Sequence, residues 1–280
     1  IPAVSCIDRH RLVARSPGAK LARWLASRDP WLVCSFDFSR VIASIQARSA
    51  QYDLLWAYGP IAAHVARVAA CAKTIVDFAD LPHEVQQQQT SRNSPTSRRH
   101  DLVMWVARAD VGRWCRFEQL LQRDCLASTV CSEREQRRSS AGKIQVLPNG
   151  YASVVPVGRL GVGVPPRALF AASPIWPPNI EGAKLLVDEI RPRILRRLPS
   201  VEILLTGSYD FLQARGEIPG VRMLGYVETM TTALAQADLV VVPLRSGTGT
   251  RLKILEAWAN RIPVVSTTTG AEGLDAQHDV

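Results

Sequence analysis

The sequence has no long uncharged hydrophobic run. A transmembrane helix needs about 20 consecutive apolar residues, and no segment of the 280-residue chain provides them. The first residues also lack a basic segment followed by an apolar one, so no secretory signal is visible. We therefore expect a cytoplasmic protein rather than one that spans a membrane.

Cysteine and histidine are scarce and poorly spaced for metal binding. The six cysteines all lie in the first half and form no CxxC pair, so we expect reduced thiols rather than a disulfide framework. The five histidines are far apart and lack the spacing of metal ligands. RNP patterns, zinc fingers and basic heptads are also missing. We expect no metal site and no nucleic-acid partner.

Positive charge is concentrated in the first half. The chain carries +9, and residues 1–150 hold 21 basic and 13 acidic residues, a surplus of +8. One interpretation is a partner such as an anionic membrane surface, with the protein peripheral at the inner membrane face. The other interpretation is that the surplus reflects amino-acid usage alone, because most basic residues are Arg, as a GC-rich genome would produce. Trp105 and Trp114, with Arg108, Arg113 and Arg116, are candidates for a membrane interface or for one amphipathic helix.

Short apolar runs alternate with longer amphipathic ones in both halves. This alternation predicts two parallel-sheet α/β domains of the Rossmann-like, doubly wound type. In the first half we expect strands at 52–57, 73–78, 128–131 and 143–147, helices at 60–70 and 101–123, and a loop at 86–99. In the second we expect strands at 167–171, 201–206, 221–224, 239–243 and 262–266, and helices at 179–197, 209–215, 228–236 and 250–260.

The two domains are joined by a segment without helical or strand periodicity. Residues 151–166 contain three Gly and three Pro, which is typical of an interdomain linker. We therefore assign residues 1–150 to an N-terminal domain and 167–280 to a C-terminal domain.

A glycine-rich loop follows the predicted strand 239–243. Gly247, Thr248, Gly249 and Thr250 let the backbone approach a ligand closely, and a helix begins directly behind them. A helix N-terminus is suited to a phosphate. Lys253 adds a full charge, and Glu256 lies on the same helix face, where a carboxylate suits ribose hydroxyls. This pattern indicates a nucleotide site. It matches neither a Walker A loop nor a dinucleotide fingerprint. A glycine-rich turn with a solvated Lys253 remains the alternative.

Several motifs in order resemble one enzyme family. Asn179 lies in a Pro-Asn-Ile-Glu-Gly segment, Gly207 ends Leu-Leu-Thr-Gly, and Tyr226-Val227 end Leu-Gly-Tyr-Val. The block from 247 to 274 is the most specific part. Residues 168–273 are similar to the donor-binding domain of group 1 (family 4) glycosyltransferases, which have the GT-B fold of two facing domains. The match is weaker at 77–81 and 146–150. Bacterial members that assemble exopolysaccharide or cell-surface sugars are the most similar.

This resemblance implies a nucleotide-sugar donor and a glycan or lipid-linked acceptor. It implies retention of anomeric configuration and no metal or other cofactor. Lys253 would contact the diphosphate and Glu256 the ribose, while Tyr226 and Val227 would face the base. The implied donor-binding residues are Asn179, Gly207, Tyr226, Val227, Gly247, Thr248, Gly249, Thr250, Lys253 and Glu256. His83, on the acceptor side, joins Lys253 and Glu256 as a catalytic candidate, whereas His64 is expected to be structural.

The sequence also departs from the family pattern. Thr248 stands where many members have a Glu, and residues 171–173 lack a usual phosphate-binding cation, for which Arg245 or Arg251 is a candidate substitute. Both ends look truncated, so we expect a piece of a longer protein. Two alternatives stay open: a sugar-nucleotide epimerase of the same fold and a non-catalytic nucleotide-sugar-binding fragment.

Overall fold

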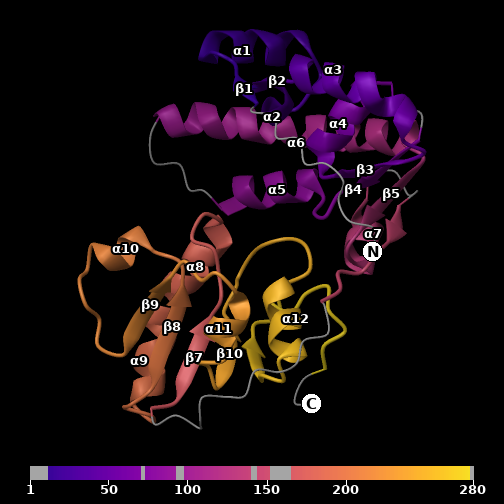
Figure 1. The fold of residues 1–280 in the computed structure, drawn as a ribbon. Coiled ribbons are helices and arrows are strands. Elements are labelled where there is room, and N and C mark those ends of the chain that lie inside the picture. Colours follow the sequence, from indigo (N-terminus) through magenta and orange to yellow (C-terminus); the bar gives the residue numbers. More distant parts are fainter. Residues whose placement is uncertain (1–11, 71–72, 93–97, 140–143, 152–164, 278–280) are drawn as a thin grey trace. The chain divides into compact units, whose positions relative to one another are not determined.

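The computed structural model describes residues 12–70, 73–92, 98–139, 144–151 and 165–277 (Figure 1). The chain divides into two compact units, Ile1–Pro148 and Asn149–Val280. Most of the segment predicted as a linker lies outside the described residues.

The first unit is built on a parallel sheet of four strands in chain order, β3-β4-β5-β6. A two-stranded antiparallel sheet, β1-β2, precedes it. The strands are β1 (Val13–Ala14), β2 (Phe36–Asp37), β3 (Leu55–Tyr58), β4 (Thr74–Asp77), β5 (Ala127–Val130) and β6 (Gln145–Val146). The helices are α1 (Pro17–Ala26), α2 (Trp31–Cys34), α3 (Ser39–Arg48), α4 (Pro60–Val68), α5 (Pro82–Arg92), α6 (Arg98–Asp124) and α7 (Glu133–Arg138), with a 3-10 turn at Ser49–Gln51.

The polar segment expected as a loop is helical up to Arg92. Helix α5 begins at Pro82, a favourable first position because proline has no N–H to leave unpaired. Glutamine is a good helix former, and the Gln86 amide donates to the Ala107 carbonyl of α6 at 3.2 Å. The loop prediction for 86–92 was therefore wrong. The polar sequence has no apolar face of its own to stabilise a helix, and contacts with α6 provide that stabilisation. Residues 93–97 lie outside the described part, and the prediction was also wrong for 98–99, which belong to α6.

Helix α6 carries both aromatic and basic residues of the suggested membrane interface. Trp114 is buried in the first hydrophobic core, and its ring packs against Phe117 at 5.7 Å. Arg113 stacks on the Trp24 ring at 4.0 Å and donates to the Trp24, Ser27 and Asp29 carbonyls. Trp114 and Arg113 thus have structural roles, and the interface interpretation is wrong for them, whereas Trp105 is 60% exposed.

His64 lies inside the same core, as expected for a structural residue. Its ring packs against Phe38 and Phe117 with centroids 5.9 and 5.4 Å apart. Burial lowers the pKa of His64 to about 4, so the ring is neutral at physiological pH. A neutral imidazole costs less to bury among aromatic rings than a charged one would.

The second unit is built on a five-stranded parallel sheet with the order β11-β10-β7-β8-β9. The strands are β7 (Arg167–Phe170), β8 (Glu202–Thr206), β9 (Val221–Gly225), β10 (Leu239–Val242) and β11 (Val264–Ser266). The helices are α8 (Pro177–Leu185), α9 (Arg191–Leu195), α10 (Asp210–Gln213), α11 (Met230–Leu234) and α12 (Leu252–Ala259), with a π-helical turn at Leu186–Ile190 joining α8 to α9. All five strands and four helical segments predicted here are confirmed.

The strand order of the second unit reverses at its first strand. The chain builds β7, β8 and β9 in one direction and then returns to add β10 and β11 on the other side of β7. Such a reversal opens a crevice beyond the carboxyl ends of the two strands at the switch point, here β7 and β10. The fold thus marks one place in the second unit for a ligand.

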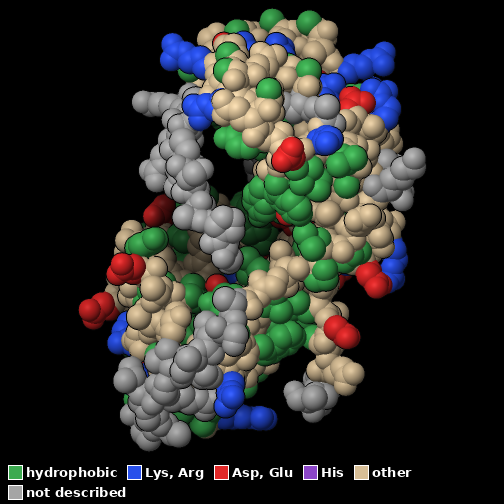
Figure 2. All heavy atoms as spheres, turned by 45° about the vertical axis from the view of Figure 1, so that its right-hand side comes forward, with side chains coloured by type: hydrophobic (Ala, Val, Ile, Leu, Met, Phe, Trp, Pro, Cys, Tyr) green, Lys and Arg blue, Asp and Glu red, His purple; other side chains and the backbone are tan. Residues whose placement is uncertain are grey.

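Hydrophobic side chains also reach the surface. Figure 2 shows hydrophobic side chains on the surface of each unit, and the exposed hydrophobic residues include Trp56 and Tyr58 of the edge strand β3. Within the described residues, no helix is both long and apolar enough to cross a bilayer. Cys34, Cys115, Cys125 and Cys131 are free thiols.

Candidate functional site

The candidate donor site lies at the switch point of the second unit. The loop after β7 leads into α8, and the loop after β10 leads into α12. Lys253, in the first turn of α12, bridges the two: its Nζ donates to Asn179 Oδ1 at 3.0 Å. The Asn179 amide in turn donates to the Ser173 carbonyl at 2.9 Å. Two of the predicted donor-binding residues, 74 positions apart, are therefore in direct contact.

The surroundings of Lys253 disfavour its positive charge. Burial and the neighbouring Arg251 guanidinium lower its pKa to about 7, against the opposing effect of Glu256. The Phe170 ring, 4.7 Å from Nζ, offers a cation–π contact in partial compensation. Because the two cations disfavour each other's charge, an anion bound near them would be stabilising.

The glycine-rich loop is fastened by Arg251. This buried side chain donates to the Thr248 carbonyl, and a Cβ on Gly247 would lie 2.6 Å from an Arg251 nitrogen. Gly247 and Gly249 have φ of +123° and +73°, which favour glycine. Arg245 instead pairs with Glu189 at 3.6 Å. Of the two suggested substitute cations, Arg251 is thus the one that contacts the loop 247–250.

Thr248 contributes a buried hydroxyl to this loop. Its Oγ1 makes no hydrogen bond to any of the residues that the structure describes, although the side chain is buried. A buried polar atom without a partner costs about 1–3 kcal/mol. A ligand hydroxyl or phosphate oxygen at the switch point could provide the missing bond.

Glu256 is half-buried one turn after Lys253. Burial raises the pKa of its carboxyl, and the Lys253 charge opposes that rise. The Glu256 charge in turn adds to the effect of burial in raising the pKa of Tyr151. Tyr151 was not anticipated from the sequence, because no motif includes it; its position directly after Asn149-Gly150 was the only signal.

A close helix approach fixes the position of Asn179. A Cβ on Gly182 of α8 would lie 2.9 Å from Leu244 Cδ2 and 3.2 Å from Phe170 Cζ. Glu181, the residue directly before Gly182, accepts a hydrogen bond from Ser246 at 3.2 Å. Helix α8 is therefore held against the loop after β10. The Asn179–Lys253 contact depends on this packing.

The remaining predicted donor-binding residues lie farther along the sheet. Gly207 follows β8 with φ of +79°, and a Cβ there would lie 2.6 Å from Pro174 Cδ. Tyr226 and Val227 follow β9, two strands beyond β7. Tyr226 is 93% exposed, whereas Val227 packs against the core. With about 4.8 Å between strands, only an extended ligand could contact both Tyr226 and Lys253.

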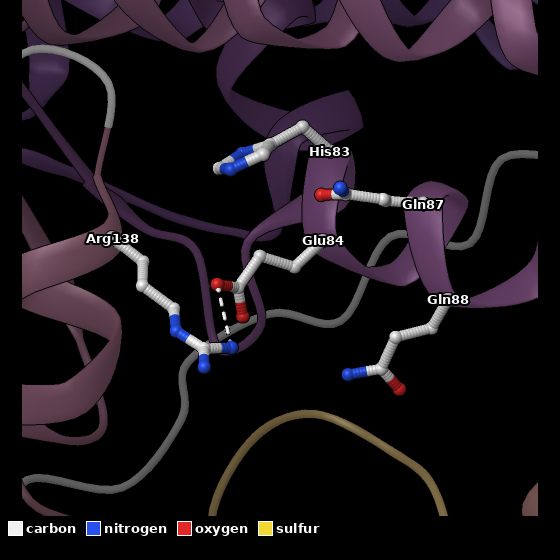
Figure 3. Close-up of a pocket in the computed structure, with 5 residues that line it drawn as sticks. All are labelled: His83, Glu84, Gln87, Gln88 and Arg138. Carbon is white, nitrogen blue, oxygen red and sulfur yellow. Dashed lines mark hydrogen bonds and ion pairs between the residues drawn. The ribbon is translucent and has the colours of Figure 1, made fainter. Parts of the chain in front are cut away.

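His83 lies in the first unit, at the start of α5. It lines a cavity of about 530 Å³ together with Glu84, Gln87, Gln88 and Arg138 (Figure 3). Arg138 of α7 donates to Glu84 Oε1 at 3.2 Å. Behind His83, Glu118 of α6 accepts from both its backbone and its ring. Glu118 and Arg138 were not anticipated, because both belong to helices without a recognisable motif.

The described residues contain no group of three or more His, Cys, Asp or Glu arranged to hold a metal ion. At the switch point of the second unit, the cationic side chains Lys253 and Arg251 lie near the carboxylate of Glu256.

Residues 165–279 match the family model for "Glycosyl transferases group 1". This match confirms the resemblance for the second unit. A 44.6 kDa protein in the cps region of Klebsiella pneumoniae is 23% identical over 122 residues, or 40% of this chain and 31% of that protein.

Solved structures show the same fold over most of the chain. Anabaena HepE in complex with UDP-glucose has a TM-score of 0.63 and 18% identity, covering 85% of this chain and 65% of HepE. A glycosyltransferase from Rickettsia africae has a TM-score of 0.52 and 12% identity, covering 82% and 62% of the two chains. The chain therefore has the GT-B fold, and it spans less than two thirds of each of these structures.

Proposed function

We propose, from the group 1 glycosyl transferase domain that residues 165–279 match, that this chain transfers a sugar from a nucleotide-sugar donor to a glycan or lipid-linked acceptor. The observation that carries the proposal is the Lys253–Asn179 contact across the switch point. It puts a cation with a lowered pKa where parallel α/β sheets bind nucleotides.

The chemistry of sugar transfer needs charge stabilisation at the departing phosphate. The bond between the anomeric carbon and the β-phosphate oxygen breaks, the nucleoside diphosphate leaves with the electron pair, and the acceptor oxygen bonds to the anomeric carbon. Lys253 and Arg251 can stabilise the negative charge that develops on the phosphate. On this basis we propose transfer without a metal, and, by similarity to the family, with retention of configuration.

We propose that the donor is a uridine nucleotide sugar. HepE has been crystallised with UDP and with UDP-glucose, and it shares the fold of this chain. Lys253 would bind the diphosphate and Glu256 the ribose, while the backbone of Tyr226 and Val227 would face the base. The loop 247–250 would enclose the sugar and phosphates, beside Asn179 and Gly207.

Surface polysaccharide assembly is the role that we propose for the whole protein. A similar protein is encoded in a cps region, where the acceptor would be a glycan or a lipid-linked sugar. The positive surplus of residues 1–150 would favour an anionic membrane surface on the cytoplasmic side. Pelleting with vesicles that contain anionic lipid tests this association, which would be absent if neither anionic lipid nor salt changed the bound fraction.

Calorimetric titration with UDP, GDP and ADP tests the donor site. We expect micromolar binding of UDP, weakened about tenfold or more in Lys253→Ala, which corresponds to about 1.4 kcal/mol. Lys184→Ala is the matched control, because Lys184 lies on α8 near the Phe211 ring and outside the proposed site. Equal binding by wild type and Lys253→Ala would contradict the assignment.

Product analysis tests the reaction itself. UDP-glucose and candidate acceptors are incubated with the protein, with and without EDTA, and the anomeric configuration of the product is determined by NMR. We expect an α-linked product, formed equally with EDTA. Conversion of the donor without any acceptor would indicate an epimerase instead.

A further inference from the structure

Helix α1 of the first unit leaves a pair of leucines open to solvent. Leu21 and Leu25 lie four positions apart, so they share one face of the helix. Their side chains are 44% and 65% exposed, and within α1 only Trp24 is buried. An amphipathic helix of a globular protein normally turns its apolar face to the core. The leucine pair Leu21–Leu25 is therefore available to a partner outside the first unit.

Trp105 of α6 places an aromatic ring beside α1. Its ring centroid lies 6.3 Å from that of Trp24, and the residue is 60% exposed. Tryptophan is enriched at membrane–water interfaces, because its ring is apolar and its N–H is polar. Arg108 lies three positions further along α6 and is also exposed. Exposed apolar side chains thus come from two helices that meet at Trp24.

The segment that contains α1 is strongly basic. Residues 15–28 hold four basic residues and no acidic one: Arg15, Lys20, Arg23 and Arg28. Helix α1 lies at the upper edge of the first unit in Figure 1, and Figure 2 shows Lys and Arg side chains around that edge. Long basic side chains can lay their apolar stems on hydrocarbon while their charges reach lipid phosphates. The charge of this segment is therefore complementary to an anionic bilayer.

Helix α1 is held in place by bonds on its buried side. The Ser16 hydroxyl caps its first turn by accepting the Ala19 N–H at 3.4 Å. The Trp24 indole donates to Asp110 of α6 at 2.9 Å, and Arg113 of α6 donates to the Trp24 carbonyl at 2.7 Å. The helix thus has its orientation before any partner binds, so binding does not require it to become ordered.

We propose that α1 and Trp105 form a docking surface for an anionic lipid bilayer, with α1 lying in the plane of the membrane interface. Leu21, Leu25 and Trp105 enter the boundary between headgroups and acyl chains, and the basic residues of 15–28 contact lipid phosphates. The inference rests on the proposed association of residues 1–150 with an anionic membrane, and it names the surface that makes the contact.

Vesicle pelleting of the full chain tests the apolar part of the docking surface. The vesicles contain phosphatidylcholine, either alone or mixed with phosphatidylglycerol. We expect wild-type protein to bind the mixed vesicles, about fivefold weaker binding for Leu25→Gln, and more than tenfold weaker binding when Leu21→Gln is added, because less apolar area enters the interface. Both leucines are exposed, so the variants should unfold at the wild-type temperature.

Leu126→Gln is the matched control for Leu25→Gln. Leu126 is 64% exposed, as Leu25 is 65% exposed, but it follows the other end of α6, about 30 Å along the helix from Trp105. We expect this variant to bind vesicles as wild type does. Equal losses in Leu25→Gln and Leu126→Gln would show general stickiness and would overturn the inference.

Lipid charge and salt test the basic part of the docking surface. We expect Arg28→Gln to weaken binding to the mixed vesicles about fivefold at low salt, as one basic residue near an anionic surface should. High salt should shrink this difference, because it screens exposed charges. Arg137→Gln is the control, since Arg137 is an exposed arginine on α7. Hydrogen exchange should slow in α1 on vesicle binding and stay unchanged in α7.

The inference and the proposed function fail in different ways. If wild type binds neither vesicle, membrane association fails and the docking surface with it, while sugar transfer is still decided by product analysis. If wild type binds but the double leucine variant binds equally, or exchange in α1 is unchanged, association stands and the docking surface is wrong. Light scattering without vesicles should show a monomer. A dimer that the double variant loses would mean that a second copy covers the leucine pair, which would also overturn the inference.

Discussion

Lys253 determines how the donor site responds to pH. In the free protein its pKa is lowered to about 7 by burial and by Arg251, so the charged and the neutral form both occur near neutral pH. A bound diphosphate places negative charge beside Nζ and favours the protonated form. Binding above pH 7 must therefore be accompanied by proton uptake.

We predict that UDP affinity falls as pH rises from 7 to 9. The decline should approach about tenfold per pH unit well above the free-state pKa, because the cation must be regenerated for binding. Calorimetry in two buffers of different ionisation enthalpy measures both the affinity and the proton uptake. Lys253→Met should bind weakly and show little change over this range. A wild-type affinity that stays constant from pH 7 to 9 would contradict the prediction.

Helix α8 depends on a residue without a side chain. Gly182 lies against Leu244 and Phe170, and both of these are buried. Alanine favours helix by about 1 kcal/mol over glycine, but here its methyl group has no room unless the helix moves. Packing and propensity therefore oppose each other at this position.

We predict that Gly182→Ala lowers the free energy of unfolding by about 1–2 kcal/mol, because overpacking outweighs the gain in propensity. It should also weaken UDP binding, since moving α8 displaces Asn179 from Lys253. Gly112→Ala in α6 is the matched control, because among the described residues no atom outside the adjoining helix backbone lies within 4 Å of the added methyl group; we expect it to stabilise by about 0.5–1 kcal/mol. Urea denaturation measures both variants, and equal effects would show that packing at Gly182 is unimportant.

Helices α1 and α2 are tied to α6 by one carboxylate. Asp110 Oδ1 accepts from Trp24 Nε1 at 2.9 Å and from the Trp31 backbone at 2.8 Å. Burial raises the pKa of Asp110 despite these bonds. Each bond joins the long helix to a different short one.

We predict that Asp110→Ala destabilises the first unit by about 3 kcal/mol, because it leaves the buried indole N–H without a partner. Asp110→Asn keeps an acceptor oxygen and should cost clearly less. Hydrogen exchange should show faster exchange in α1 and α2 for the alanine variant, while the second unit stays unchanged. Unaltered exchange in α1 and α2 would mean that other contacts hold them.

Each unit of the molecule has its own hydrophobic core. Leu121 is fully buried in the first core and Leu205 in the second. Two cores built from separate stretches of chain are the usual basis for separate folding units. The stability of each unit should therefore respond to its own core.

We predict two thermal transitions in calorimetry. Leu121→Ala should lower one of them and Leu205→Ala the other, each through a loss of about 2–5 kcal/mol. Binding of UDP should raise the transition that Leu205→Ala lowers, because the proposed donor site is in that unit. If both variants lowered one shared transition, the molecule would unfold as a single cooperative unit.

The sequence by itself determined the elements of the second unit. Buried parallel strands read as short apolar runs, for example 239–243, and α12 has clear amphipathic spacing. The glycines of the next loop and Lys253, at the start of the following helix, lie within seven residues of one another. They can therefore be recognised from the sequence as one motif. Local pattern and final structure agree there because each element is specified by its own residues.

Tertiary structure decided the features that depend on distant residues. Helix α5 forms from a polar glutamine-rich segment because it packs on α6, and His83 acquires a carboxylate partner 35 residues away. Likewise, the contact of Lys253 with Asn179 exists only because β10 is inserted beside β7. Neither propensity nor spacing encodes such pairings, because they are made when the sheet orders its strands and the helices pack against them.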